Sequence, residues 1–231
     1  MIRSAFQKLL LASAAVALFL APSALADSTA SMTLTGAGSN TLDGVYIGPY
    51  TATINGVSTP VICDDYADES YLPESWTANV ASLTSLTNTN HPGQTQDYEE
   101  IIYLSNELLA APVNSLQAGE IQFALWAVFD PTALTDLTAY NSADGAAAGA
   151  YLSGAVSNAG PADLTGYAIY TPIITDPITC SGYDRSVCPS TPPQEFIVRT
   201  PEPGTLLLLA LGLGGLLFFG RKQRLSSLSL S

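Results

Sequence analysis

The chain has 231 residues, of which 47% are hydrophobic and only 12% charged, and its 20 acidic residues far outnumber its 7 lysines and arginines. A net charge of -13 excludes a basic nucleic-acid-binding surface. Between residues 27 and 200 only Arg185 and Arg199 are basic, so phosphate and anionic lipid would repel this segment. Its apolar content is too high for disorder and predicts one folded domain.

The first 26 residues have the features of a secretory signal peptide. A positive start, an apolar run and a small-x-small cleavage site follow one another: Arg3 and Lys8, residues 9–20, and Ala24 with Ala26. We therefore expect cleavage after Ala26 and export of residues 27–200.

Residues 27–80 predict β-strands. The clearest pattern is a hairpin, in which strands 50–54 and 57–63 are joined by Asn55-Gly56, the dipeptide that a tight primed turn requires. Pro60 indicates that the second strand is interrupted or lies at an edge. Residues 33–35 and 75–80 also alternate and predict further strands.

The middle of the chain changes to helical spacing. Residues 97–109 predict an amphipathic helix, with Glu99 and Glu100 in the favourable first turn. Residues 116–129 predict a second helix that Ser115 caps and Asp130-Pro131 ends. Because its apolar residues occur nearly all round, this second helix should be buried.

The composition of residues 141–166 fits a helix with loops but does not decide the structure. Residues 167–174 and 194–198 predict closing strands. We find no internal repeat, and we expect a mainly β fold with inserted helices, of the α+β class, in a single exported domain.

A different kind of segment follows the expected domain. It consists of Pro201-Glu202-Pro203, a predicted transmembrane helix over 205–220, a basic cluster of Arg221, Lys222 and Arg224, and a short tail over 225–231. The basic cluster predicts a cytoplasmic end, so residues 27–200 should face outward.

This order resembles the PEP-CTERM sorting tail of exported bacterial proteins, over residues 201–224. The resemblance implies that an exosortase, a membrane cysteine protease, recognises the tail, cuts near the motif and passes the protein to the cell surface or extracellular polymer. Pro201, Glu202 and Pro203 would then be a recognition site, not a catalytic one. Residues 44–50, 63–65 and 193–196 also resemble segments of uncharacterised members of this sorted group.

Three cysteines in an exported protein leave one over after any single disulfide. Cys180 and Cys188 enclose a short polar loop and are the natural pair. Cys63 is then alone at the end of an apolar strand, where it could be a buried small side chain.

Gln122 is a polar residue on the helix that should be buried, and its amide needs hydrogen-bond partners there. Ile62-Cys63 and the motif Ile121-Gln122-Phe123-Ala124-Leu125-Trp126 resemble the thioester domains of bacterial surface proteins. The resemblance implies a bond between the sulfur of Cys63 and the side-chain carbonyl of Gln122. Such a bond would let the domain attach covalently to an amine or hydroxyl.

Two other functions have partial support in the sequence. Asp64, Asp65 and Asp68 belong to an acidic run that could bind calcium, but the run lacks the spacing of a calcium loop and fits a solvated turn better. The one histidine, His91, lies in an expected loop and could pair with Cys63 for thiol catalysis, although nothing local supports this pairing.

The sequence therefore predicts an exported, membrane-tethered cell-surface or extracellular-matrix protein with a structural or binding role, and not an enzyme. A covalent adhesin with a Cys63–Gln122 thioester is the alternative, and a calcium-dependent binding module is the second alternative. The expected partners are an exosortase, the membrane, and an extracellular polysaccharide or a surface amine or hydroxyl. No cofactor and no nucleic acid are expected.

Overall fold

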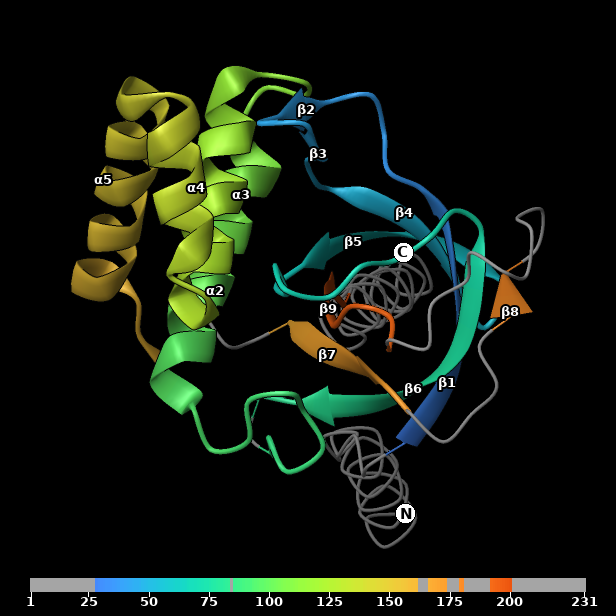
Figure 1. The fold of residues 1–231 in the computed structure, drawn as a ribbon. Helices are drawn as coiled ribbons and strands as arrows, with labels where there is room; N and C mark the ends of the chain where they lie inside the picture. The colour runs from blue at the N-terminus through green and yellow to red at the C-terminus, as the bar shows by residue number, and fades with distance from the viewer. Residues whose placement is uncertain (1–27, 84, 162–165, 174–178, 181–191, 201–231) are drawn as a thin grey trace, which may run out of the picture. The chain divides into compact units, whose positions relative to one another are not determined.

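The computed structural model describes residues 28–83, 85–161, 166–173, 179–180 and 192–200. Within the compact unit Leu25–Thr200, a barrel of strands lies beside a layer of helices (Figure 1). The expected α+β class is confirmed for this part of the chain. None of the described helices is both long and apolar enough to cross a membrane. The expected signal peptide and the helix over 205–220 lie outside the described residues.

Six antiparallel strands form the barrel in the ring order β1-β4-β5-β9-β7-β6, which closes where β6 pairs with β1. Their bounds are Ser28–Gly36 for β1, Tyr50–Ile54 for β4, Val57–Cys63 for β5, Glu74–Ser82 for β6, Tyr167–Pro172 for β7 and Phe196–Arg199 for β9. The short strand β8, Thr179–Cys180, pairs with the start of β6, and β2 (Thr41–Leu42) pairs with β3 (Val45–Tyr46).

The predicted hairpin is present as β4 and β5. Asn55 and Gly56 have φ angles of 48° and 85°, as a primed turn requires. Strand β5 continues through Pro60, which pairs with Thr51 of β4. On its other side β5 pairs with β9 only at Ile62 and Cys63, so the missing N–H of Pro60 costs no described ladder bond.

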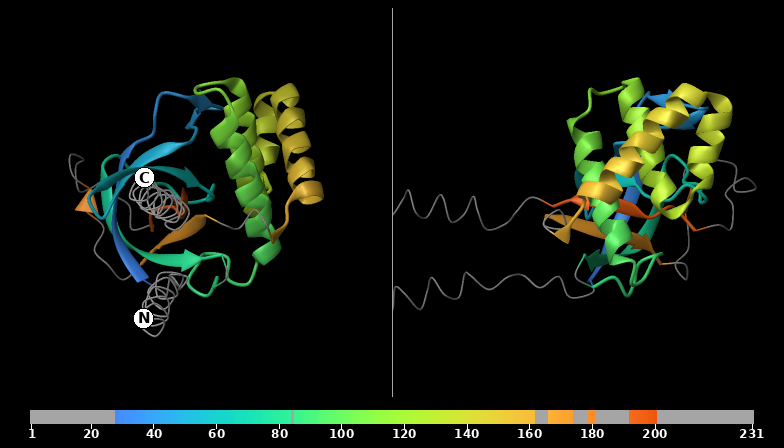
Figure 2. Two further views of the ribbon diagram at one scale, coloured as in Figure 1. Left: turned by 180° about the vertical axis from the view of Figure 1, so that it is seen from behind. Right: turned by 90° about the vertical axis from the view of Figure 1, so that its left-hand side faces the viewer.

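Four helices form the second layer: α2 (Thr95–Ala110), α3 (Leu116–Phe129), α4 (Thr132–Tyr140) and α5 (Ser142–Asn158). The second predicted helix is confirmed as α3, and the side chain of Ser115 accepts a hydrogen bond from the backbone N–H of Ala118 at 3.1 Å. Helix α3 lies among α2, α4 and α5 (Figure 2), which explains why it is apolar on nearly every side.

The buried residues of the barrel strands belong to two apolar clusters, one on each face of the strands. Inward-facing side chains such as Met32, Val61 and Phe196 fill the barrel. Outward-facing Ile62, Ile169 and Ile197 pack instead with the buried faces of the helices. Because successive residues of a strand point to opposite faces, Ile62 faces the helices and Cys63 faces the barrel interior.

Candidate functional site

The end of β5 meets α2 and α3, and four fully buried polar residues lie there: Cys63, Asp64, Gln122 and Glu195. We refer to these four residues as the junction. The three segments 44–50, 63–65 and 193–196 all contribute side chains or backbone to the junction or its immediate contacts. Segments that are far apart in the sequence are therefore brought together around one small volume.

The structure brings Gln122 and Cys63 together. The side-chain N–H of Gln122 (Nε2) donates a hydrogen bond of 2.8 Å to the backbone carbonyl of Cys63, and both residues are 0% exposed. The Oε1 atom of Gln122 has no hydrogen-bond partner among the described residues. An unsatisfied buried amide oxygen is uncommon, so this atom marks a site that needs an explanation.

Gly48 makes room for this amide oxygen. A Cβ atom at Gly48 would lie 2.7 Å from Oε1 of Gln122 and 3.2 Å from the ring of Tyr50. A side chain at this position would thus push against Gln122. The loop between β3 and β4 accordingly forms one wall around the Gln122 amide.

The Cys63 thiol is held by backbone groups. Its Sγ donates to the carbonyl of Asp65 at 3.0 Å and accepts from the N–H of Asp65 at 3.4 Å. Burial raises the pKa of the thiol well above its ordinary value, and the neighbouring charge of Asp64 raises it further. The hydrogen bond from the backbone N–H of Asp65 opposes this shift in part. Cys63 is therefore a protonated, water-shielded thiol in this structure.

Aromatic rings cover α3 beside the junction. The ring of Tyr66 packs 5.3 Å from Trp126 and 5.9 Å from Phe123, and its hydroxyl donates to Asp136 at 3.1 Å. Partial burial, followed by this hydrogen bond and the nearby negative charges of Asp136, Asp43 and Asp130, raises the pKa of Tyr66 to about 12. Negative charge therefore surrounds the aromatic cover.

Glu195 was not among the site residues predicted from the sequence. Its carboxylate accepts hydrogen bonds from the hydroxyl of Tyr98 at 2.6 Å, from the backbone N–H of Asn90 at 2.9 Å, and from the hydroxyl of Thr171. These donors come from α2, the loop before it and β7. A signal was present, because Glu195 immediately precedes a strand whose next three residues are apolar.

Asp64 lies opposite Glu195, but its carboxyl group has no comparable set of hydrogen-bond donors. Asp64 is 1% exposed, and neither carboxyl oxygen meets a donor among the described residues. Burial first, and then the charge of Glu195, raise the pKa of Asp64 well above its ordinary value. The charged form of Asp64 is therefore disfavoured in the folded protein.

The structure does not arrange the three candidate calcium ligands around one point. Asp64 points into the junction, whereas Oδ1 of Asp65 accepts the backbone N–H groups of Ala67 and Asp68 at 3.1 and 3.2 Å. No three His, Cys, Asp or Glu side chains within the described ranges are arranged to hold a metal ion. The described residues therefore give no support to the calcium-dependent alternative.

His91 packs against aromatic rings, and no contact between it and Cys63 is found among the described residues. The ring of His91 is stacked on Phe129, with 3.6 Å between centroids, and meets Tyr98 edge-on at 6.5 Å. Strand β8 contains Cys180, but Cys188 lies outside the described residues, so the predicted disulfide remains a prediction.

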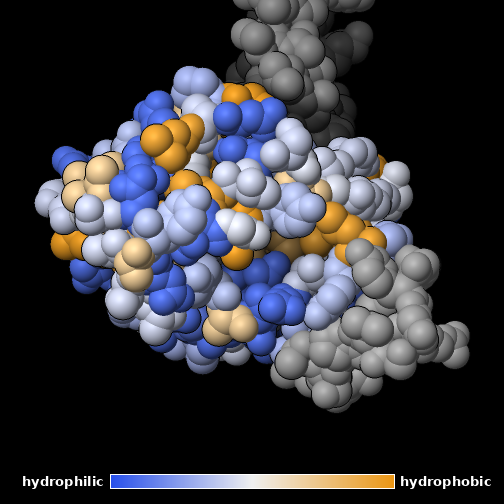
Figure 3. Space-filling model, turned by 45° about the horizontal axis from the view of Figure 1, so that its top comes forward, coloured by the Kyte–Doolittle hydropathy of each residue, from blue (hydrophilic) through white to orange (hydrophobic). Residues whose placement is uncertain are grey.

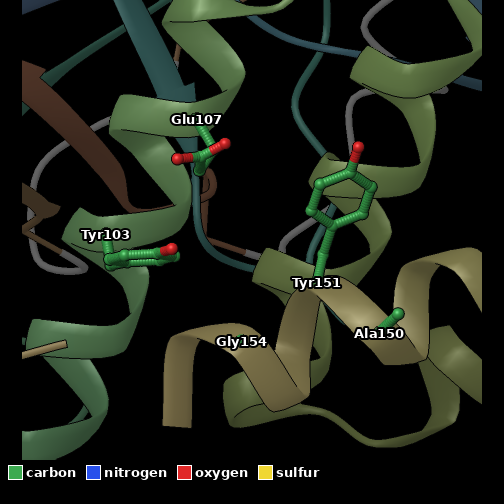
Figure 4. Close-up of a pocket in the computed structure, with 5 residues that line it drawn as sticks. All are labelled: Tyr103, Glu107, Ala150, Tyr151 and Gly154. Carbon is green, nitrogen blue, oxygen red and sulfur yellow. The ribbon is translucent and has the colours of Figure 1, made fainter. Parts of the chain in front are cut away.

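A shallow hollow of about 220 Å³ lies on the outer face of the helical layer, between α2 and α5. It is lined by Tyr103, Glu107, Ala150, Tyr151 and Gly154, and Figure 4 shows its two tyrosine rings on facing helices. None of these residues belongs to the junction. The molecular face shown in Figure 3 is mainly hydrophilic, with scattered apolar residues.

The decisive comparison concerns the end of the described domain and the residues after it. A family model for the PEP-CTERM protein-sorting motif matches residues 199–224. The chain carries a PEP-CTERM sorting motif. The PEP-CTERM motif marks an exported bacterial protein with a membrane-anchored sorting signal that an exosortase recognises. The motif residues predicted from sequence, Pro201 to Pro203 and the basic cluster, fall inside this match but outside the described residues. No curated protein and no solved structure matches the chain.

Proposed function

We propose that this exosortase-sorted protein is a covalent surface adhesin, in which Cys63 and Gln122 form an internal thioester. The observation that carries the proposal is the contact between the Gln122 amide and the backbone of Cys63, at 2.8 Å and wholly out of water. The thiol would add to the amide carbon of Gln122, the C–N bond would break, and one ammonia would leave. The unsatisfied Oε1 atom becomes the carbonyl oxygen of the thioester.

Burial supports this chemistry because a thioester survives only when water is kept away from it. The site lies behind aromatic rings and between the barrel and α3. A nucleophile that reaches the bond would take the Gln122 acyl group and release the Cys63 thiol. The protein would then be fixed to its target through a new amide or ester bond.

Charge favours an amine as the target group. Carboxylates of Asp43, Asp130 and Asp136 surround the aromatic cover, and they attract cations. The segment 27–200 contains no lysine, so it offers no side-chain amine that could react with its own thioester. An amine-bearing surface or polymer is therefore the expected partner, alongside the membrane tether.

The test is the intact mass of the purified protein, measured before and after treatment with methylamine. We expect a mass short by one ammonia, restored with one methylamine added. Gln122→Ala should abolish methylamine addition, because the acyl group is removed. Gln96→Ala, which removes an exposed glutamine on α2, should leave it unchanged.

A wild-type mass that methylamine does not alter would contradict the thioester. The protein would then be a passive structural or binding component of the cell surface or matrix. In that case the hollow between α2 and α5 would be one concave surface to test for polysaccharide binding.

A further inference from the structure

The hollow between α2 and α5 presents two tyrosine rings and one carboxylate to the same space. Tyr103 and Glu107 lie four residues apart on α2, so both project from one face of that helix. Tyr151 projects from the facing helix α5, and Figure 4 shows an open space among the three side chains. None of the three belongs to the junction, so the hollow is a site separate from the proposed thioester.

Small residues keep this space open. The α5 side of the hollow is lined by Ala150 and Gly154, which lie four residues apart and therefore share a face of the helix. A Cβ atom added at Gly154 would meet nothing within 4 Å, so the space above this glycine is unfilled. The volume of about 220 Å³ is below the roughly 300 Å³ at which pockets for drug-sized ligands begin, and it suits one small ring.

The two tyrosine rings are anchored on one side and accessible on the other. Both are half-buried and pack against the apolar cluster of the helical layer, which restricts their motion before a ligand arrives. Their hydroxyls and the Glu107 carboxylate have no hydrogen-bond or ion-pair partner among the described residues. The polar groups that line the hollow are thus held in place and available to a ligand.

Charge selects the class of ligand. Neither α2 nor α5 contains a lysine, an arginine or a histidine, so no cation on these helices neutralises Glu107. An anion would be repelled there, whereas a protonated amine would be attracted by the carboxylate and by the negative faces of the tyrosine rings. The same ring faces can cover the apolar C–H face of a sugar.

We propose that this hollow binds a sugar ring that carries a protonated amine, as one unit of an amino-sugar polymer outside the cell. The tyrosine rings of α2 and α5 flank the sugar, and Glu107 accepts hydrogen bonds from its ammonium group. Because the hollow is shallow, neighbouring units of the polymer can continue out of it. The inference goes beyond the proposed thioester, since binding in the hollow needs neither Cys63 nor Gln122.

The test is a calorimetric titration of the purified full-length protein with β-linked tetrasaccharides of glucosamine, N-acetylglucosamine and glucose. At about pH 6 the amines of the glucosamine oligomer are protonated, whereas the other two oligomers carry no charge. We expect the glucosamine oligomer to bind at least about 5-fold more tightly than either neutral oligomer. Absence of binding, or equal affinity for a neutral oligomer, would overturn the proposal.

Variants separate the hollow from the general negative charge of the protein. Gly154→Leu fills the open space and Tyr103→Ala removes one ring, so each should weaken binding by about 5-fold or more, whereas Tyr103→Phe should keep most of the affinity. Glu107→Gln should also weaken binding. Glu99→Gln removes the same charge about two turns away on α2, outside the hollow, and should not.

The outcomes distinguish the hollow from both overall charge and the thioester. Gly154→Leu replaces a helical glycine and should be at least as stable as the wild type in thermal unfolding, so a loss of binding in it is not a loss of fold. Wild-type affinity in Gly154→Leu, or equal weakening by Glu107→Gln and Glu99→Gln, would overturn the site. Methylamine addition should be unchanged in Gly154→Leu, so the thioester is tested independently.

Discussion

Asp64 and Asp65 are consecutive residues, yet the first belongs to the buried junction and the second begins the loop of residues 65–73. Asp65 is half-buried and accepts two backbone N–H groups, so its negative charge is satisfied locally. The carboxyl oxygens of Asp64 meet no donor among the described residues, and burial raises the pKa of this group well above its ordinary value. The difference shows that an acidic run in a sequence does not define one electrostatic environment. Where a strand ends, alternate residues enter separate environments.

The largest effect should come from removing the acceptor in the junction. Glu195→Ala would leave the buried hydroxyls of Tyr98 and Thr171 without an acceptor, and we expect it to lower the free energy of unfolding by about 3 kcal/mol or more. Asp65→Ala removes bonds at the edge of solvent and should cost about 1 kcal/mol. Urea unfolding of both variants measures the two losses. Equal losses would contradict the contrast between the regions.

The pH dependence of stability should differ between the two regions. The pKa of Asp64 is raised in the folded protein, so the folded state binds more protons than the unfolded state, and the free energy of unfolding falls as pH rises above the ordinary pKa of aspartate. The slope expected for one proton is about 1.4 kcal/mol per pH unit. Asp64→Asn should remove it.

The comparison residue in the loop is Asp68. Partial burial first, and then Asp65, raise the pKa of Asp68 to about 6, but solvent screens this group. Asp68→Asn should therefore change the slope much less, and only between about pH 4 and 6. Unfolding curves at several pH values test both variants. A larger change of slope for Asp68→Asn than for Asp64→Asn would contradict the assignment of the main pH dependence to Asp64.

A smaller effect should follow from filling the space beside Gln122. Gly48→Ala places a Cβ atom 2.7 Å from Oε1 of Gln122, so the amide must move, and we expect a loss of about 1 to 3 kcal/mol. Methylamine addition should also fall. Gly154→Ala on α5 meets nothing within 4 Å and should instead stabilise by about 0.5 to 1 kcal/mol. Thermal unfolding distinguishes the two. A neutral Gly48→Ala would show that the Gln122 amide is not confined.

Local signals predicted the local structure well. The Asn55-Gly56 turn and the Ser115 cap depend on residues next to one another, and both were identified. Helix α4 was missed because it restarts directly after Pro131 and buries only Ala133 and Leu137, too few for a clear helical period.

Long-range structure was not predictable in the same way. Strands β1 and β6 pair and close the barrel, and only tertiary packing brings these two segments together. The meeting of Cys63 with Gln122 was indicated by a motif resemblance, whereas the opposition of Asp64 and Glu195 depends on the register of β5 against β9. No pattern within either segment encodes that register.

The position of β9 has a mechanical consequence. This strand pairs with β5 at Ile62 and Cys63 and with β7 along its length, and the chain continues from its far end toward residue 200 and the sorting motif. A pull directed along β9 would load the bonds to both neighbouring strands in shear. The same strand begins beside the junction, so only a few residues separate the proposed thioester site from the end of the strand that leads to the sorting motif.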